Sequence, residues 1–194
     1  MKFYDRTQEL ELLWDINKQS RNTACFTVMV GRRRIGKTSL LLESMKGEKF
    51  LYLFVSRKSE VLLCEQFQQE IKDSLELEIF GNVTEFRILF EQLMIYATQT
   101  HFTLIIDEFQ EFDNINSSIF SDIQNIWDRY KEQAKINFIA CGSIYSMMKK
   151  IFENNEEPLF GRLTSKIILK PFRISTIKEI LKDYNPEYTP EDLL

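Results

Sequence analysis

Residues 28–41 read VMVGRRRIGKTSLL, an apolar run that leads through two glycines into a lysine, a threonine and more leucines. Gly31, Gly36, Lys37 and Thr38 fit the spacing G-x-x-x-x-G-K-[ST], in which the backbone N–H groups of a glycine-rich loop surround phosphate oxygens. In such a loop Lys37 reaches the β- and γ-phosphates and the Thr38 hydroxyl ligates Mg²⁺. A helix beginning here would direct its positive end at the anion.

The segments on either side favour a phosphate-binding loop over the alternative, a solvated basic loop. Cys25–Val30 is a hydrophobic strand candidate directly before it, and Lys37–Met45 has the pattern of a helix directly after it. The three consecutive arginines occupy variable positions, which we expect to project away from the phosphates toward a neighbouring domain, a subunit or nucleic acid. The predicted nucleotide-binding residues are Gly31, Arg32, Arg33, Arg34, Ile35, Gly36, Lys37, Thr38 and Ser39.

Short hydrophobic runs alternate with longer stretches of helical period along the rest of the chain. The strand candidates are Cys25–Val30, Phe50–Val55, Phe102–Asp107, Ile136–Cys141 and Lys166–Leu169. Their nearly continuous apolar residues suit parallel strands that are covered on both faces. The helix candidates are Arg6–Lys18, Lys37–Met45, Glu60–Leu75, Glu85–Thr98, a helix from Ser117 or Ser118 to Lys131, and Ile174–Tyr184. This alternation predicts an α/β fold, a three-layer sandwich whose mostly parallel five-stranded sheet lies between helices.

Caps and core faces can be predicted for two of these helices. Asp5 precedes the first helix and Thr84 precedes the helix from Glu85, so each is a candidate N-cap. One face of the first helix carries Leu10, Leu13 and Trp14, which we expect to pack against the core. The corresponding stripe on the later helix comprises Phe86, Leu89, Phe90, Leu93 and Met94.

An acidic pair, Asp107-Glu108, ends the strand candidate about 70 residues after the glycine loop. Ligands of open α/β sheets bind at this carboxyl edge. Asp107 is therefore predicted to hold Mg²⁺, directly or through water, and Glu108 to polarise a water for attack on the γ-phosphate. A carboxylate placed directly after the metal-binding aspartate favours hydrolysis over transfer to a small acceptor. The alternative for the isolated pair is a solvated strand end.

Ser143 follows the next strand candidate, in the sequence Phe138-Ile-Ala-Cys-Gly-Ser143. Its hydroxyl is a candidate contact for the γ-phosphate or the attacking water. The same residue also suits the N-cap of a following helix, and the two roles are compatible.

Five stretches together resemble one known family, the archaeal-type ATPases of the AAA/STAND P-loop group, which also occur in bacteria. They are FYDRTQELELL, GRRRIGKTSLL, LIIDEFQEF, FIACGSIYSMM and PLFGRLTSKIILKPF, and the resemblance extends from Phe3 to Leu194. It implies a P-loop NTPase with an AAA-type core, binding of ATP with Mg²⁺, the acidic pair described above, and Ser143 as γ-phosphate sensor. It also implies that Phe3, Tyr4 and Arg6 line the adenine pocket, whereas from the residues alone they are an ordinary helix entry.

The resemblance also suggests how the chain is divided. We expect an ATPase core at residues 1–172 and the truncated start of a helical lid at residues 173–194, because Thr189-Pro190-Glu191-Asp192 opens a helix of one turn. Relatives usually continue into a winged-helix domain. A nucleic-acid or protein partner would therefore bind through domains beyond this segment.

Four other features have competing interpretations. Arg162, in Gly161-Arg162-Leu163-Thr164, is a candidate arginine finger acting in cis or across a subunit interface, which would make a homo-oligomer functional, or else an exposed loop arginine. His101 is interpreted as structural or solvated. Phe109 and Phe112 are interpreted as packing residues. Glu111 and Asp113 suit a solvated face better than a metal cluster.

Composition excludes several classes of protein. The net charge of −4 argues against a surface built for nucleic acid or anionic membrane throughout, and no apolar run is long enough to span a bilayer. The three cysteines lack metal-ligand spacing, which indicates buried, reduced thiols in a cytoplasmic protein. The leading function is a Mg²⁺-dependent ATPase acting as a switch or remodelling module. The alternatives are a nucleotide- or nucleic-acid-binding module with little hydrolysis, and a small-molecule kinase, for which no basic acceptor lid is evident.

Overall fold

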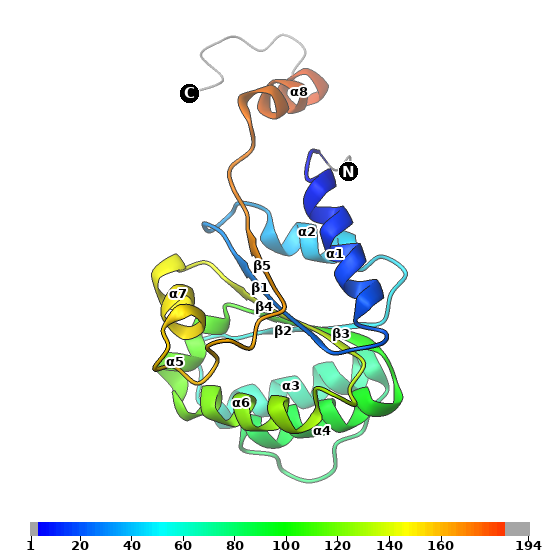
Figure 1. Cartoon of the computed structure of the whole chain (residues 1–194), viewed down its shortest axis with the longest axis vertical. Helices are drawn as coiled ribbons and strands as arrows, with labels where there is room; N and C mark the ends of the chain where they lie inside the picture. The colour runs from blue at the N-terminus through cyan, green and yellow to red at the C-terminus, as the bar shows by residue number, and fades with distance from the viewer. Residues whose placement is uncertain (1–3, 185–194) are drawn as a thin grey trace.

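A five-stranded parallel sheet in the order β2-β3-β4-β1-β5 forms the middle layer of the computed structural model, which describes residues 4–184 (Figure 1). Each pair of neighbouring strands is parallel. The strands are β1 Cys25–Val30, β2 Phe50–Phe54, β3 Phe102–Asp107, β4 Ile136–Gly142 and β5 Ser165–Ile168. The predicted three-layer fold is therefore confirmed, and the predicted strand bounds differ from these by at most a residue at either end.

Helices cover both faces of the sheet (Figure 1). Helices α1 (Thr7–Gln19) and α2 (Lys37–Ser44) lie on one face, and α3 (Glu60–Leu75), α4 (Phe86–Gln99) and α6 (Ser118–Tyr130) lie on the other. Three further elements were absent from the sequence-based assignment: the 3₁₀ turn η1 (Phe109–Glu111), the single-turn α5 (Phe112–Ile115) and α7 (Tyr145–Glu153). The last helix, α8 (Ile174–Tyr184), lies beyond the end of the sheet, near the start of α1.

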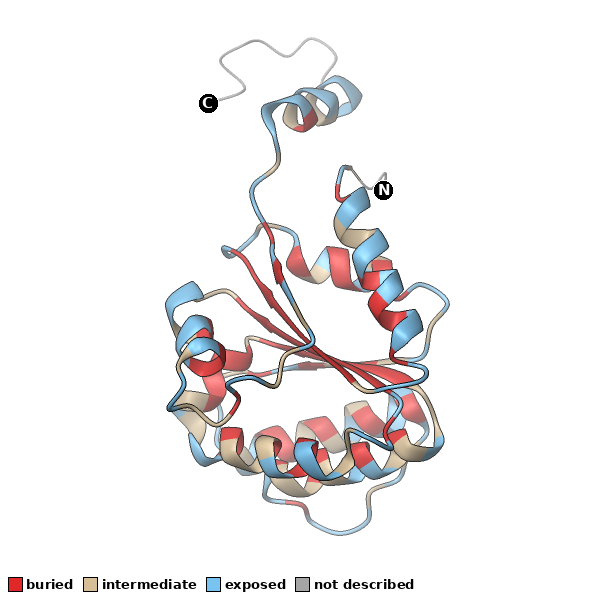
Figure 2. Cartoon of the chain, viewed as in Figure 1, coloured by how far each residue is buried: buried red, intermediate tan, exposed pale blue. Residues whose placement is uncertain are grey.

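The alternation of side chains along the strands divides the core into two clusters. On β1, Phe26 and Val28 belong to the larger cluster, under α3, α4 and α6, whereas Cys25 and Met29 belong to the smaller one, under α1 and α2. Figure 2 shows the central strands buried along their length. Because both faces are covered, these strands carry apolar residues almost continuously, which is the pattern visible in the sequence.

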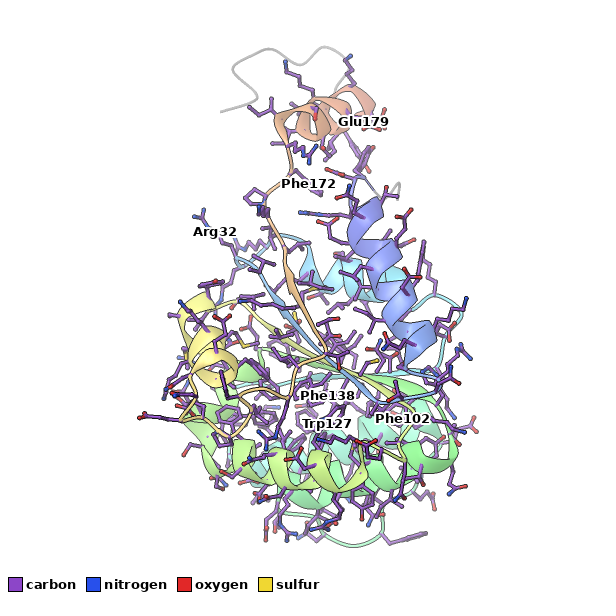
Figure 3. The ribbon with its side chains drawn as sticks, viewed as in Figure 1. Arg32, Phe102, Trp127, Phe138, Phe172 and Glu179 are labelled. Atoms are coloured by element: carbon purple, nitrogen blue, oxygen red, sulfur yellow. The ribbon has the colours of Figure 1, made fainter. Side chains whose placement is uncertain are left out.

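An aromatic group beneath the sheet fixes the position of β1 relative to β4. The ring of Phe26 stacks on Phe138 of β4 with centroids 4.2 Å apart and contacts Trp127 of α6 at 5.2 Å (Figure 3). Truncating one such ring to alanine typically costs about 3–5 kcal/mol, because the remaining side chains cannot fill the cavity. This packing holds the strand whose carboxyl end carries the glycine loop.

Three predictions about helix ends and faces were wrong. Arg6, not Asp5, is the N-cap of α1, and Glu85, not Thr84, is the N-cap of α4. Neither Arg6 nor Glu85 makes a side-chain capping bond. The carboxylate of Asp5 instead accepts from the Arg6 amide at 2.9 Å. Trp14 is 50% exposed, because the buried stripe of α1 runs through Leu13, Ile16 and Asn17. The stripe predicted for α4 is buried throughout.

Contacts with the N-terminal segment hold α8 in place. The Thr176 hydroxyl donates to Asp5 Oδ2 at 2.8 Å, and the Tyr4 hydroxyl donates to Asp183 Oδ2 at 2.7 Å. The helix start predicted at Thr189 lies outside the described residues. Within residues 4–184, no helix combines the length and apolar character that crossing a bilayer requires.

Candidate active site

The glycine loop leaves the carboxyl end of β1 and turns directly into α2. Gly36 is the N-cap of α2 and has φ = +93°, a conformation that glycine adopts without strain. Lys37 is almost fully buried, and its Nζ donates to the carbonyls of Gly31 at 2.9 Å and Arg32 at 3.2 Å. The loop therefore encloses a cationic group within reach of its own backbone, at the positive end of a helix.

Two hydroxyls converge on the carboxylate that ends β3. The Thr38 hydroxyl donates to Asp107 Oδ2 at 2.9 Å, and the Tyr52 hydroxyl, from β2, donates to the same oxygen at 2.8 Å. The other oxygen, Oδ1, accepts from the amide of Glu108 at 2.9 Å. Burial raises the pKa of Tyr52, and the hydrogen bond and charge of Asp107 raise it further, so the phenol stays protonated as a donor.

Sequence reasoning missed Tyr52. Its position alternates with the buried residues Leu51 and Leu53 on β2, and the strand pairing sets it opposite Ile105 on β3. That register brings its hydroxyl to the strand end where Asp107 lies. The only signal in the sequence was a polar tip in an otherwise apolar strand.

Glu108 has a left-handed backbone, with φ = +53°, and its carboxylate is held by neighbours on two elements. The Ser143 hydroxyl donates to Glu108 Oε2 at 2.8 Å, and the amide nitrogen of Gln110 donates to the same oxygen. The N-cap of α7 is Ile144, without a side-chain bond, so the N-cap interpretation of Ser143 was wrong. Its hydroxyl faces the acidic pair instead.

These groups line or adjoin one cleft of about 660 Å³. Lys37, Thr38, Asp107 and Glu108 lie on its wall together with Tyr52 and Ser39. Ile35 instead packs against the core cluster under α1 and α2. Residues about 70 positions apart in the sequence are thus brought to the same edge of the sheet.

The arginines of the loop do not all face outward as predicted. All three are exposed, but Arg33 and Arg34 line the cleft, and Arg33 Nε lies 3.5 Å from the Ser143 hydroxyl. Arg32 stands at the outer tip of the loop, directed away from the sheet (Figure 3). Only Arg32 therefore matches the outward position expected for all three.

Glu111 was wrongly predicted to be solvated. It is 4% exposed, and its carboxylate accepts from Arg57 Nε at 3.1 Å and from the Asn114 amide at 3.0 Å. Burial raises the pKa of Glu111, but the hydrogen bonds from Arg57 and Asn114 lower it, and the net pKa lies below the ordinary value. The packing interpretation of Phe109 and Phe112 is confirmed, since both rings are buried.

The oxygen groups at the floor of the cleft suit Mg²⁺. A threonine hydroxyl and a carboxylate oxygen 2.9 Å apart are hard ligands, and Mg²⁺ commonly takes only one or two protein carboxylates, its other ligands being water and phosphate. Within residues 4–184, no group of three or more histidine, cysteine or acidic side chains is arranged to hold a metal. Thr38 and Asp107 are thus the residues that would hold the cation.

The remaining predicted site residues lie away from this cleft. Arg162 precedes β5, and the Phe26 amide donates to the Thr164 hydroxyl at 3.0 Å, which places this segment at the amino edge of the sheet. Five residues of β1, ~16 Å at the usual rise, separate that point from the glycine loop. The Arg162 guanidinium donates to Asp128 Oδ2 at 2.7 Å. A role in cis does not fit this geometry, and a role across a subunit interface stays a prediction.

The segment predicted to line an adenine pocket adjoins a second hollow of about 420 Å³ beside the starts of α1 and α8. Arg6 lies on its wall but is 6% exposed, because its guanidinium donates to the Lys170 carbonyl at 2.6 Å and lies 4.6 Å from the Phe172 ring centroid. Tyr4 contacts α8 through Asp183. Phe3 lies outside the described residues.

The predictions for the cysteines and the histidine are confirmed. All three cysteines are free and buried. His101 is partly buried, its Nε2 lies 2.9 Å from the Ser20 hydroxyl, and burial lowers its pKa, so it is a structural residue. Burial raises the pKa of the Cys141 thiol, and the Asp107 carboxylate adds to that effect, which keeps this thiol protonated beside the cleft.

Similarity to solved structures agrees with this fold. The Walker-type ATPase of Pyrococcus abyssi superposes with a TM-score of 0.69 at 17% identity, covering 98% of this chain and 61% of that one. Cdc6p from Pyrobaculum aerophilum gives 0.64 at 20% identity, covering 92% and 48%. The Drosophila origin recognition complex bound to DNA gives 0.64 at 13% identity, covering 94% and 46%. At these identities the similarity establishes the fold alone.

Sequence similarity gives information about the family as well as the fold. An uncharacterized protein from Methanocaldococcus jannaschii is 29% identical over 177 residues, which cover 91% of this chain and 38% of that protein, so the chain spans well under half the length of this relative. The model of a family described as an ATPase domain predominantly from Archaea matches residues 3–192. The chain belongs to this family of predominantly archaeal ATPase domains.

Proposed function

We propose that this chain binds ATP with Mg²⁺ and hydrolyses it, and that it serves as a nucleotide-driven switch or remodelling module. One observation carries the proposal: a buried lysine in a glycine loop, a Thr38–Asp107 pair and Glu108 share one cleft. Each of these groups has a separate task in phosphoryl transfer to water, and their tasks are complementary.

In this mechanism the loop amides and Lys37 bind the β- and γ-phosphates, and Lys37 exchanges its contacts with loop carbonyls for contacts with phosphate oxygens. Bound Mg²⁺ would neutralise charge on the phosphates. Thr38 and Asp107 would hold that ion. Glu108 orients a water in line with the γ-phosphate and accepts its proton, and Ser143 donates to the γ-phosphate or holds the Glu108 carboxylate.

Several finer assignments belong to the same proposal. The adenine base binds on the side of the hollow that Arg6 lines. Tyr4 and Phe3 keep the adenine-binding role that the family resemblance implies. Arg162 serves a neighbouring copy in a homo-oligomer. Residues 1–172 act as the core and residues 173–194 begin a lid, in a cytoplasmic protein whose partners bind through further domains.

The test compares ATP binding and hydrolysis by the wild type with those of Lys37→Ala and Glu108→Gln. Lys37→Ala is expected to lose nucleotide affinity by roughly 10- to 100-fold, the range of a charge-assisted hydrogen bond. Glu108→Gln is expected to bind ATP normally and to turn over poorly. Lys46→Ala removes an exposed lysine outside the cleft and is the matched control. Equal ATP affinity in wild type and Lys37→Ala would refute the proposal.

The second candidate function is nucleic-acid binding with little hydrolysis. The observation that favours it is the exposed Arg32 at the outer tip of the loop, with Arg33 and Arg34 beside it. Binding of single- or double-stranded DNA that survives Lys37→Ala but is lost when these arginines are neutralised would support this function over the first.

A further inference from the structure

Gln110 is a buried polar residue that the mechanism above does not use. It lies in η1, directly after the acidic pair, and has no exposed surface. Its amide nitrogen donates to Glu108 Oε2, the same oxygen that accepts from the Ser143 hydroxyl. Two donors from different elements therefore hold one carboxylate oxygen, and within residues 4–184 no side chain or amide donates to Oε1.

The orientation of this amide is fixed by charge. Only the nitrogen can face a carboxylate, since turning the amide over would place two acceptor oxygens together. The amide oxygen then points into the protein, where it is buried without a hydrogen-bond partner. A buried acceptor without a partner lowers stability, so packing alone does not account for glutamine here.

The surroundings leave the amide little freedom. A Cβ on residue 142 would lie 2.5 Å from Gln110 Oε1 and 2.5 Å from Met148 Sδ, so Gly142 is required for this side chain to fit. Glu108 itself has φ = +53°, a strained backbone conformation that persists only where surrounding contacts hold it.

We propose that Gln110 is a positioning residue for ATP hydrolysis, which holds Glu108 Oε2 so that Oε1 faces the attacking water. The inference rests on the proposed function, because it assigns a supporting residue to the same site. Gln110 does not line the cleft and acts only through Glu108. The oxygen of the Gln110 amide lacks a hydrogen-bond partner, while its nitrogen holds the catalytic carboxylate of Glu108. Stability is thus lost where orientation of the site is gained.

The test uses Gln110→Met in the full chain, a change that keeps the length of the side chain and removes both the donor and the unpartnered acceptor. We expect an unchanged or higher melting temperature, unchanged ATP affinity and KM, and single-turnover hydrolysis slower by roughly 10- to 100-fold. In the Glu108→Gln background, followed over long single turnovers, the same substitution is expected to slow hydrolysis no further.

Asn137→Leu is the matched control. Asn137 is also a fully buried amide whose oxygen lacks a partner, and it lies near the opposite end of β4 from Gly142. Its replacement should alter stability and leave hydrolysis unchanged.

The outcomes distinguish a failure of the proposed ATPase function from a failure of the role assigned to Gln110. A wild type without single-turnover hydrolysis overturns both of them. A hydrolysing wild type matched by Gln110→Met overturns this inference alone. A fall in the melting temperature of Gln110→Met would show that Gln110 has a packing role. If the substitution slows hydrolysis equally in the wild-type and Glu108→Gln backgrounds, Gln110 acts independently of Glu108. Either result overturns the assignment.

Discussion

The Thr38 hydroxyl donates a 2.9 Å hydrogen bond to Asp107 Oδ2, although the two residues belong to different βα units. The bond joins the first turn of α2 to the carboxyl end of β3. The strand order explains the proximity, because β4 alone separates β1 from β3 in the sheet. Two oxygens suited to Mg²⁺ are thus adjacent before any ligand arrives.

Asp107→Asn tests the proposed metal role. The amide keeps the size of the side chain but lacks the charge that a divalent cation requires, so Mg²⁺ should no longer strengthen nucleotide binding and hydrolysis should be lost. Nucleotide titrations with and without Mg²⁺ measure this difference. Asp113→Asn, on α5 and outside the cleft, should behave as the wild type. A variant that retains the full Mg²⁺ effect would contradict the assignment.

Gly36→Ala tests the geometry of the loop. At φ = +93° an alanine is strained by about 1–2 kcal/mol, and relaxation of that strain would move the loop amides. We expect lower stability together with weaker ATP binding. Gly47, with φ = +79° and open space where an added Cβ would lie, is outside the cleft. Gly47→Ala should show the same loss of stability in chemical denaturation but should keep the wild-type affinity for ATP.

Arg57→Ala tests the ion pair with Glu111 through its pH dependence. Because the pKa of Glu111 is lowered in the folded state, the pair stabilises the fold above the unfolded value, about 4.3, and this contribution disappears as the pH falls through the lower folded value. The variant should be less stable by about 1 kcal/mol near neutral pH, a modest figure because Arg57 is largely exposed.

The difference between wild type and Arg57→Ala should vanish in acid-denaturation series below that window. Lys72→Ala breaks a pair with Glu78 in which both side chains are exposed, and it should be nearly neutral at every pH. A destabilisation by Arg57→Ala that persists unchanged in acid would show that packing, not the charge of Glu111, is responsible.

Arg162→Ala tests whether Arg162 acts as an arginine finger or only forms an ion pair at the surface. Its pair with Asp128 is partly exposed and should contribute at most about 1 kcal/mol to stability. A finger acting across an interface instead predicts a loss of specific ATPase activity that appears only at protein concentrations where copies associate. Arg129→Ala, which removes an exposed arginine of α6 that pairs with Glu91 of α4, is the control. Wild-type activity of Arg162→Ala at every concentration would exclude the finger.

Much of the fold could be predicted because the signals in the sequence are local. Continuous apolar runs such as Phe102–Asp107 identify buried parallel strands, and the glycine loop fixes where β1 ends and α2 begins. Lys37, Thr38 and Asp107 could be assigned together because the carboxyl ends of parallel strands meet at one edge.

The features that could not be predicted from the sequence depend on tertiary contacts. The hydroxyl of Tyr52 reaches Asp107 through the pairing of β2 with β3, and the Glu111 carboxylate accepts from Arg57, which lies in the loop after β2. The role of Gln110 depends on a glycine on β4 that leaves it room. The role of Arg162 in cis stayed open as an alternative because the sequence does not reveal at which end of the sheet its segment lies.

The strand that carries the glycine loop also constrains the order of folding. Cys25 of β1 pairs with Asn137 of β4, and Val30 pairs with Ile168 of β5, so both neighbours of β1 are made long after it during synthesis. Such distant pairings make folding slow, because a long chain must close before they form. The glycine loop lies in the first fifth of the chain, but we expect its strand to be fixed in the sheet last. Nucleotide should therefore bind, and stabilise, only the chain in which the sheet is complete.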